Sequence, residues 1–317
     1  LEFTVEDSTK GWCDAFTAGI KAWYSGRDMA FDFSLVRPVG TRLETKGGKA
    51  SGPGPLRNLL QFSKAKVLAR QGRRLRTIDV HDIICKIGEN VVAGRVRRSA
   101  LISLSDLDDE EMRKAKVGQF YLNEPQRSLA NNSAVYNERP SANEFLREWV
   151  SLAESGTGER GIFNRGGLEK QLPERRWEVF QEHVQTAGTN PCGEIVLRSK
   201  QFCNLTEVVA RAEDTEETLV RKARLASILG TYQSTLTNFP YISKDWKNNC
   251  EEERLLGVSI TGQWDCPAVR NNGTLRKLKE MAIETNREYA KKFGVNPSTA
   301  VTAVKPSGNT SQLTNAS

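Results

Sequence analysis

Short extended segments alternate with longer helical segments along this chain of 317 residues. Trp12, Phe16 and Ile20 recur every four residues and predict an amphipathic helix over residues 7–24. Over residues 99–105, apolar side chains mixed with serines predict a strand. Strands separated by helices are typical of an α/β barrel or a layered α/β sheet, because each helix covers a face of the sheet. With no internal repeat and no long linker, the chain is expected to form one α/β domain.

The same patterns predict the remaining elements. Helices are expected over residues 56–70, 78–93, 108–116, 142–153, 216–236, 251–261 and 275–293. Strands are expected over 29–36 and 300–304, a turn region over 158–167, and two extended pieces around a polar hairpin over 189–209. Glycines make residues 39–55 a loop suited to closing over a ligand, because glycine permits positive φ and close backbone approach.

The composition is that of a globular protein, with 38% hydrophobic and 27% charged residues. No run of about 18 apolar residues appears, so no membrane span is expected. The first residues lack the features of a signal peptide, so a reducing compartment, the cytoplasm, is expected. Because the chain begins with Leu1 instead of methionine and stops at Ser317 just after a glycine-containing turn, both ends are expected to be cut.

Six cysteines occur without a close CxxC pair, and there are only two histidines. No zinc site can be assembled from this spacing, so no metal is expected. His81 and Cys85 lie four residues apart and are expected on one helix face, as core packing. Four cysteines are expected to be structural: Cys13, Cys85, Cys250 and Cys266.

The net charge is +7, with arginines clustered near residues 70–76 and 95–98. Such clusters suit an anionic partner. A solvated helix end with a few structural ion pairs explains them equally well. Charge alone does not decide between these readings, nor between nucleotide phosphates and nucleic acid.

The most informative stretch runs over residues 188–205. Cys192 lies between proline and glycine, which holds it on a constrained turn. Glu194 places a carboxylate near this thiol, and Asn190 adds an amide that donates and accepts hydrogen bonds. Cys203 follows eleven residues later on the expected return strand. From the residues alone, two readings remain open: a redox site with acid–base assistance, or a tight turn with two unrelated buried cysteines.

The motif also resembles a known family. Asn-Pro-Cys-Gly-Glu over residues 190–194, followed by Cys-Asn-Leu over 203–205, resembles the active-site finger loop of ribonucleotide reductases. Proline and glycine beside the cysteine are similar to the adenosylcobalamin-dependent (class II) enzymes, especially the ribonucleoside-triphosphate reductases. Other segments resemble this family in the same order: residues 37–53, 91–100, 130–133, 257–262 and 304–308.

The resemblance implies a fold and a division of the chain. Residues 1–317 would form an incomplete catalytic domain, part of the ten-stranded α/β barrel of ribonucleotide reductases. Residues 1–100 would hold the effector and specificity-loop region, 187–209 the finger loop, and 300–317 a phosphate-binding turn. The partner redox cysteine would precede Leu1, and most cobalamin contacts would follow Ser317.

The resemblance also implies residue roles. A thiyl radical at Cys192 would remove the ribose 3′ hydrogen, with adenosylcobalamin as the cofactor. Glu194 would act as general base on the 3′ hydroxyl, and Asn190 would orient the substrate hydroxyls. Cys203 and its partner would supply the reducing equivalents and become a disulfide, which thioredoxin or a similar dithiol resets. The product would be a 2′-deoxyribonucleotide for DNA synthesis.

The implied binding residues form two groups. A ribonucleoside triphosphate would contact two segments of the chain: Ser51, Gly52, and Pro306, Ser307, Gly308, Asn309, Thr310 and Ser311. A deoxynucleoside triphosphate effector would be sensed through Gly47, Gly48 and Lys49. Residues 305–311 also read as a strand end and helix start that expose N–H groups to an anion, or as an ordinary capped helix start. Two positions depart from the family pattern: Asn309, where threonine is expected, and Arg95, where a small or polar residue is expected.

Three alternatives remain. The chain could belong to a class I-type large subunit that needs a metal-containing radical subunit. It could be a non-catalytic nucleotide-binding remnant, and the chain in isolation is expected to be inactive. A basic nucleic-acid-binding module leaves the cysteine motif without a role, and no helix-turn-helix or aromatic-rich strand pattern supports it. Neither a nucleic-acid nor a membrane partner is therefore expected.

Overall fold

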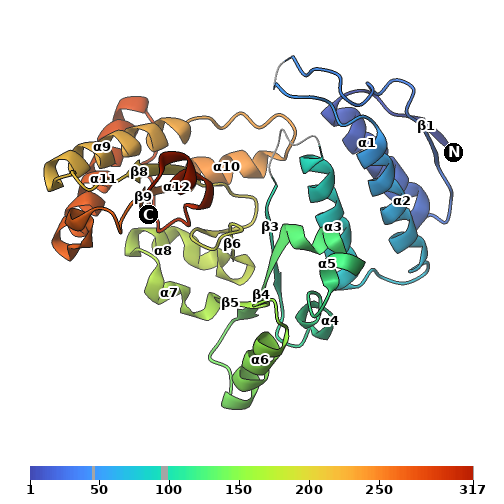
Figure 1. Cartoon of the computed structure of the whole chain (residues 1–317), viewed down its shortest axis with the longest axis horizontal. Helices are drawn as coiled ribbons and strands as arrows, with labels where there is room; N and C mark the ends of the chain where they lie inside the picture. Colours follow the sequence, from blue (N-terminus) through green and yellow to red (C-terminus); the bar gives the residue numbers. More distant parts are fainter. Residues whose placement is uncertain (45–46, 94–98, 317) are drawn as a thin grey trace. The chain divides into compact units, whose positions relative to one another are not determined.

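The computed structural model describes residues 1–44, 47–93 and 99–316, and the chain divides into two compact units (Figure 1). Unit 1 is Leu1–Phe163 and unit 2 is Asn164–Ser317. The expectation that the chain forms one domain stays a prediction. No helix in the described ranges has the length and apolar character needed to cross a bilayer.

Unit 1 begins with three helices packed around an apolar core. Strand β1 (Glu2–Thr4) pairs in parallel with β2 (Ala30–Asp32), and α1 (Thr9–Tyr24) connects them. Helices α2 (Gly54–Leu68) and α3 (Thr77–Val92) follow. The Ser8 hydroxyl caps α1 by accepting from the Gly11 N–H at 2.9 Å. The core cluster here comprises Val5, Ala15, Trp23, Val36, Leu56, Leu59, Leu60 and Val67. The three helices expected in this region are confirmed.

The rest of unit 1 is built on a three-stranded sheet in the order β3-β4-β5. Its strands are β3 (Leu101–Ser105), β4 (Ala130–Tyr136) and β5 (Gly161–Asn164), with β3 and β4 parallel. The short helices α4 (Glu110–Arg113), α5 (Phe120–Asn123) and η1 (Pro125–Leu129) connect β3 to β4, and α6 (Ala142–Glu154) follows β4. The strand expected near residue 100 is confirmed as β3, whereas the helix expected over 108–116 is only the four-residue α4.

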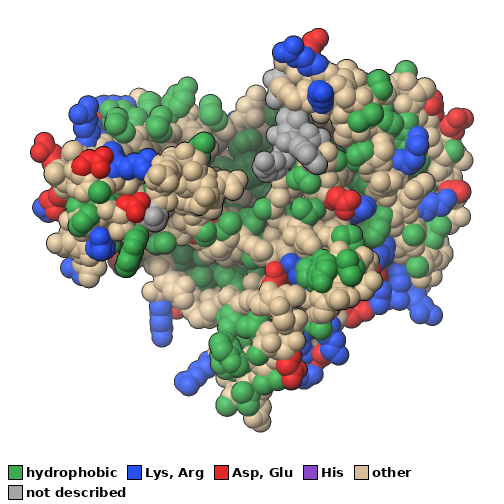
Figure 2. Space-filling model, in the orientation of Figure 1, with side chains coloured by type: hydrophobic (Ala, Val, Ile, Leu, Met, Phe, Trp, Pro, Cys, Tyr) green, Lys and Arg blue, Asp and Glu red, His purple; other side chains and the backbone are tan. Residues whose placement is uncertain are grey.

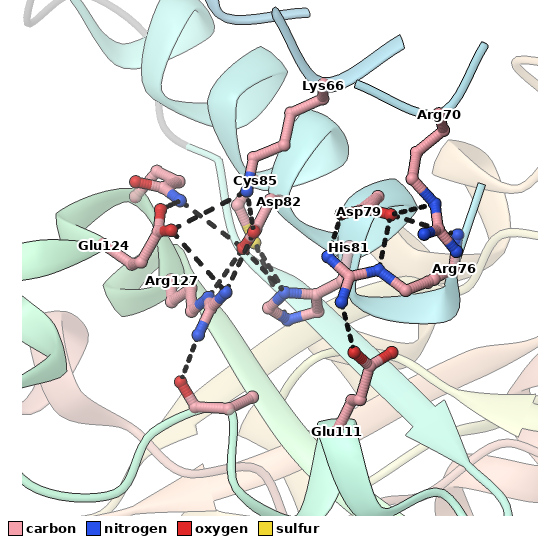
Figure 3. Close-up of polar contacts among 12 residues, drawn as sticks. Lys66, Arg70, Arg76, Asp79, His81, Asp82, Cys85, Glu111, Glu124 and Arg127 are labelled. Atoms are coloured by element: carbon pink, nitrogen blue, oxygen red, sulfur yellow. Dashed lines mark hydrogen bonds and ion pairs between the residues drawn. The ribbon is translucent and has the colours of Figure 1, made fainter. Parts of the chain in front are cut away.

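A buried polar network joins α3 to η1 and to α2 (Figure 3). Asp82 is completely buried and accepts from Arg127 Nε at 2.6 Å and from Lys66 Nζ at 2.7 Å. Burial alone would raise the pKa of Asp82, but its contacts with Arg127, His81 and Lys66 hold that pKa well below its usual range. The network therefore depends on a charged carboxylate inside the unit.

His81 and Cys85 share one face of α3, as expected. The Cys85 thiol lies 3.8 Å from the His81 ring, whose Nε2 is 3.1 Å from Asn132 Oδ1 on β4. Burial, together with the charge of Asp82, raises the pKa of Cys85 to about 11. His81 and Cys85 are therefore core residues, and the contact of His81 with Asn132 links α3 to β4.

The first arginine cluster is partly explained by ion pairs. Arg76 Nη2 lies 2.8 Å from Asp79 Oδ1, and Arg70 Nε lies 3.6 Å from Asp79 Oδ2 (Figure 3). Arg73 and Arg74 are exposed. The second cluster, Arg95, Arg97 and Arg98, lies outside the described residues, as does half of the 91–100 motif.

Helix α6 buries a charge and exposes apolar side chains. Glu148 is 8% exposed and contacts Arg113 and Arg160, with Arg113 Nε 2.6 Å from Glu148 Oε1. Figure 2 shows hydrophobic side chains gathered over this helix, which exposes Phe145, Leu146, Trp149 and Val150. The helix is therefore oriented by its buried ion pairs and not by its apolar stripe.

Unit 2 contains a parallel sheet covered by long helices on one face. Strand β8 (Asn204–Val209) pairs with β9 (Leu256–Thr261) in the register Asn204↔Leu256 to Val209↔Thr261. Beyond β9, residues 300–303 run parallel to it, with Ala303 N–H donating to Val258 O at 3.1 Å and a bridge at Thr302. These contacts support the strand expected over 300–304, although the segment pairs with β9 through a single β-bridge and is not a full strand.

Helices α9 (Glu216–Gln233) and α11 (Asn272–Phe293) pack together against β8 and β9 (Figure 1). Alternate strand residues face these helices, and the core they form comprises Val208, Ala226, Leu256, Val258, Ala282 and Val301. The opposite face carries Leu205, Glu207, Gly257 and Ser259, and we call it the inner face. Long helices expected over 216–236 and 275–293 are confirmed.

The helix expected over residues 251–261 is wrong. Helix α10 (Lys244–Glu253) ends earlier, because Arg254 adopts a left-handed conformation with φ of 44°. After Leu255, residues 256–261 form the buried strand β9. The acidic residues 251–253 do continue a helix, but the β-branched residues after Gly257 favour a strand between two parallel neighbours.

The remaining elements of unit 2 are short. Residues 165–186 form η2 (Arg165–Gly167), α7 (Leu168–Gln171), α8 (Glu174–Phe180) and η3 (Gln181–Thr186). Strands β6 (Gly188–Thr189) and β7 (Val196–Leu197) form an antiparallel hairpin. Helices η4 (Pro267–Arg270) and α12 (Gly308–Thr314) complete the unit. The hairpin expected within residues 189–209 is confirmed, but its return strand is β7, so Cys203 does not lie on the return strand as expected but immediately before β8.

Candidate active site

The cysteine motif forms the tip of the β6–β7 hairpin. Thr189 pairs with Val196, and beyond this pair Asn190 N–H donates to Ile195 O at 3.0 Å. Gly193 N–H donates to Asn190 O at 2.9 Å, which closes a four-residue turn. Proline suits the second position of such a turn, and Gly193 has a φ of 84° that other residues rarely adopt. The sequence therefore fixes this turn locally.

Asn190 holds the turn with one end of its amide. Its Oδ1 accepts from the Ile195 N–H at 3.0 Å. Within the described ranges its Nδ2 has no hydrogen-bond partner, so it remains available as a donor. The amide can therefore orient a ligand by donation, while its acceptor stays bound to the hairpin.

The thiol and the carboxylate of the motif differ in environment. Cys192 is exposed at the turn, between Pro191 and Gly193. Glu194 is half-buried, and its Oε2 is buried with no hydrogen-bond partner among the residues that the structure describes. A buried carboxylate oxygen without a partner is costly. This oxygen is therefore suited to accept a proton or a hydrogen bond from a bound molecule.

Cys203 lies immediately before β8 and is half-buried. Burial and, next, the negative charge of Glu194 raise the pKa of Cys203 to about 11. The carboxylate of the hairpin and the second thiol are thus within electrostatic range of each other. At neutral pH Cys203 is a protonated thiol.

The base of the hairpin rests on the inner face of the sheet. A Cβ atom added at Gly257 on β9 would lie 2.5 Å from Leu205 Cδ2 and 3.1 Å from Ile195 Cδ1. Only glycine leaves room here for the residue that follows Glu194. The 257–262 motif therefore has a physical role, which is to let the hairpin approach the sheet.

The expected phosphate-binding turn follows the strand segment 300–303. Lys305 N–H donates to the Ser259 hydroxyl at 3.1 Å on the inner face. After Pro306 and Ser307 the short helix α12 begins, and Ser311 N–H makes its first hydrogen bond, to Ser307 O at 2.9 Å. The N–H groups of residues 308–310 precede this bond and lack helical partners.

Two further contacts define this turn. The buried Ser307 Oγ has no hydrogen-bond partner in the described part of the chain. Arg211, just after β8, donates to Asn315 O at 2.8 Å and to Thr314 O at 2.5 Å, which fixes the end of α12. Ser307, Gly308, Asn309, Thr310 and Ser311 are therefore held at one end of the sheet, where free donors suit an anion.

The other expected binding residues belong to unit 1. Residues 39–44 and 47–52 form a loop in which Leu43 N–H donates to Gly48 O at 3.0 Å and Lys49 forms an isolated antiparallel β-bridge with Arg42. Gly52 has a φ of 66°, and a Cβ atom there would lie 2.9 Å from Val39 N. Gly47, Gly48, Lys49, Ser51 and Gly52 thus lie together in this loop, and two positions within it, 45–46, are outside the described residues.

Sequence reasoning did not single out two carboxylates of unit 2. Glu207 pairs with Ser259 on the inner face, and its buried Oε1 has no hydrogen-bond partner within the described ranges. Because side chains alternate between the two faces of a strand, the position of Glu207 two residues after Leu205 could have predicted that it lies on the same face. Glu253, at the end of α10, is completely buried, and no local pattern pointed to it.

Comparisons with known proteins agree with this geometry. The chain is 28% identical over 355 aligned positions to the adenosylcobalamin-dependent ribonucleoside-triphosphate reductase of Lactobacillus helveticus (strain DPC 4571), covering 99% of the chain and 46% of the relative. It is 26% identical to the protein of the same name from Euglena gracilis, covering 99% of the chain and 43% of that relative. No protein-family model matches the chain.

Two solved structures share the fold. A crystal structure of a B-12 dependent (class II) ribonucleotide reductase superposes with a TM-score of 0.77 at 24% identity, covering all of this chain and 48% of that one. The class Id ribonucleotide reductase alpha subunit of Actinobacillus ureae superposes with a TM-score of 0.52 at 15% identity, covering 98% of this chain and 59% of that one. The chain spans about half the length of the curated relatives it matches.

The fold of the chain is therefore the one that these two ribonucleotide reductase structures share. Within this class, its sequence is similar along nearly its whole length to adenosylcobalamin-dependent ribonucleoside-triphosphate reductases. The resemblance read from the cysteine hairpin is thereby confirmed.

Proposed function

We propose that the protein carrying this chain reduces ribonucleoside triphosphates to 2′-deoxyribonucleoside triphosphates by thiyl-radical chemistry at Cys192. The observation that carries the proposal is the hairpin itself. It presents an exposed thiol two residues from a carboxylate whose buried Oε2 lacks a partner within the described chain, near a second, protonated thiol. The relatives named above support the reaction and the substrate class.

Each residue of the hairpin has a defined part in this reaction. The Cys192 sulfur takes the ribose 3′ hydrogen atom and later returns it. Glu194 accepts the 3′ hydroxyl proton, which assists departure of the 2′ hydroxyl as water. The free Nδ2 of Asn190 donates to a ribose hydroxyl. Cys203 and a partner thiol provide two electrons and two protons, and their sulfurs form a disulfide.

Adenosylcobalamin, when bound, supplies the organic radical that starts such chemistry. The exposed position of Cys192 at the tip of the turn fits this cofactor, because an external radical can reach the thiol without displacing other side chains. The chain's own residues then hold ribose and place the proton at Glu194.

The proposed partners follow from the two binding regions. The triphosphate of the substrate is placed at residues 306–311, where free N–H groups and Ser307 Oγ support anion binding. Ser51 and Gly52 are assigned to the substrate, and Gly47, Gly48 and Lys49 to a deoxynucleotide effector. A thioredoxin-like dithiol in the cytoplasm resets the disulfide.

The test is ribonucleotide reduction by the full-length protein with a dithiol, with and without adenosylcobalamin. We expect cobalamin-dependent formation of deoxynucleotide that is lost in Cys192→Ala, while Cys13→Ala, which changes an exposed cysteine of unit 1, retains it. Activity only with an added metal-containing radical subunit would keep Cys192 but change the enzyme class. No reduction under either condition would refute the proposal.

A further inference from the structure

We propose that Glu253 is a positioning residue for the thiol chemistry, holding the cysteine hairpin, the Cys203 segment and the strand before the phosphate turn at one point. This inference rests on the proposed function. Glu253 is the last residue of α10 and has no exposed surface. Its two oxygens accept three hydrogen bonds, from Arg176 Nε at 2.8 Å, Gln201 Nε2 at 2.8 Å and Thr299 Oγ1 at 3.0 Å.

The first bond leads to the hairpin. The Arg176 guanidinium also donates from Nη2 to Val196 O at 2.7 Å. Val196 is the β7 residue that pairs with Thr189 at the base of the turn. One buried guanidinium therefore connects Glu253 to the strand two residues beyond Glu194, and because its fork is planar and rigid, it fixes direction as well as distance.

The second bond leads to the other thiol. Gln201 donates to Glu253, and its own Oε1 accepts from the Arg198 N–H at 3.2 Å. The amide thus clamps the segment between β7 and β8 on which Cys203 lies. Since Gln201 is two residues before Cys203, the position of this thiol relative to the hairpin depends on the same carboxylate.

The third bond leads toward the phosphate turn. Thr299 is held twice, because its N–H donates to the Glu253 carbonyl at 3.0 Å and its hydroxyl donates to the carboxylate. Thr299 directly precedes the segment 300–303, which leads to Lys305 and to α12. The cysteine hairpin, the Cys203 segment and the strand before the phosphate turn are therefore all connected by hydrogen bonds to the Glu253 side chain.

The negative charge of Glu253 is required, and not only its shape. Arg176 and Arg198 are both almost completely buried, and Arg198 Nε lies 3.6 Å from Glu253 Oε1. A glutamine at this position would be neutral and would turn an NH2 group toward at least one of the three donors. One branch of the network would then lose its acceptor, and the guanidinium groups would lose their shared counter-charge.

Displacement of the hairpin should appear in catalysis before it appears in binding. Hydrogen transfer needs the sulfur about 3 to 3.5 Å from its target atom, and a displacement of about 1 Å lowers such rates by about a hundredfold. The phosphates, by contrast, are held by the N–H groups of α12. A change at Glu253 should therefore lower kcat much more than it raises KM.

The experiment compares Glu253→Gln with Glu252→Gln in the full-length protein with adenosylcobalamin and a dithiol. Glu252 is the matched control, because it is the preceding residue and also pairs with Arg198, but its side chain is 53% exposed. We expect kcat of Glu253→Gln to fall by at least about tenfold, with KM for the ribonucleoside triphosphate within about twofold. Glu252→Gln should keep both values within about twofold.

Two further variants keep the test decisive if Glu253→Gln does not fold. Thr299→Val removes one hydrogen bond at similar volume, and Glu253→Asp restores the charge on a shorter side chain. We expect a smaller loss of kcat in each, again without a matching rise in KM. An unchanged kcat in folded Glu253 and Thr299 variants, or an equal loss in Glu252→Gln, would overturn the inference. Absence of reduction by the unaltered protein would instead refute the proposed function.

Discussion

At the scale of single residues, the two cysteines of the candidate site lie in opposite environments. Cys192 is exposed on a turn that proline and glycine specify, whereas Cys203 is half-buried beside the charge of Glu194. A thiol with a pKa of about 11 remains protonated at neutral pH, so it carries the hydrogen that a reductant must deliver. The two sulfurs are thus distinguished by location before any cofactor acts.

This difference predicts the result of neutralising Glu194. In Glu194→Gln the repulsion between carboxylate and thiolate disappears, so the pKa of Cys203 should fall from about 11 by on the order of one unit. Burial, the larger cause, stays and keeps that pKa above the ordinary value. The measurement is the rate of Cys203 alkylation against pH, followed on its own peptide by mass spectrometry.

Glu207→Gln is the matched control for that measurement. It removes a carboxylate from the same inner face, but Glu207 is not among the main causes of the raised pKa of Cys203. Its alkylation profile should follow that of the unaltered protein. A Cys203 profile that stayed in place, or moved to higher pH, in Glu194→Gln would contradict the assigned electrostatic coupling.

At the scale of elements, α6 predicts an unusual order of mutational effects. Glu148 is buried between Arg113 and Arg160, whereas Trp149 next to it is 55% exposed. Glu148→Ala should lower the free energy of unfolding by about 3 to 5 kcal/mol, because it removes the buried carboxylate that the Arg113 and Arg160 guanidinium groups share. Trp149→Ala should cost less than about 1 kcal/mol. Chemical denaturation of both variants measures this, and the reverse order would mean that the aromatic stripe holds the helix.

The helices with regular apolar spacing were predictable from the sequence. Residues 7–24, 78–93 and 275–293 differ from α1, α3 and α11 by only a few positions at each end. Their apolar faces repeat with the helical period, so local pattern and tertiary packing agree. The turn at Cys192 was predictable for a similar reason, because proline and glycine restrict the backbone locally.

The elements that were missed depend on partners far away in the sequence. Strand β4 contains Asn132, whose amide is satisfied by His81, 51 residues earlier. Glu253 meets Arg176 and Gln201 at separations of 77 and 52 residues. Polar residues at such positions do not follow a hydrophobic period, because distant side chains compensate their burial. No local pattern therefore identified β4 or the Glu253 network.

At the scale of the whole molecule, each unit is organised around a completely buried carboxylate. Asp82 serves unit 1, with Arg127 and Lys66 as partners, and Glu253 serves unit 2, with Arg176. These carboxylates lie among residues that come from separate helices and strands. The same type of interaction therefore replaces apolar packing at the points where several elements meet.

Because Asp82 is buried and charged, the protein should lose folding stability at low pH through this residue. The pKa of Asp82 in the folded chain lies well below the value of about 3.9 expected after unfolding. A carboxylate with a lowered pKa contributes stability that is fully present above about pH 4 and is lost as the pH falls toward the folded value. Asp82→Asn should therefore lower the free energy of unfolding by about 3 to 5 kcal/mol at pH 7, and by clearly less at pH 3. Denaturation at the two pH values measures this, with the exposed Asp108→Asn as control, and a difference independent of pH would show that Asp82 acts through shape and not through charge.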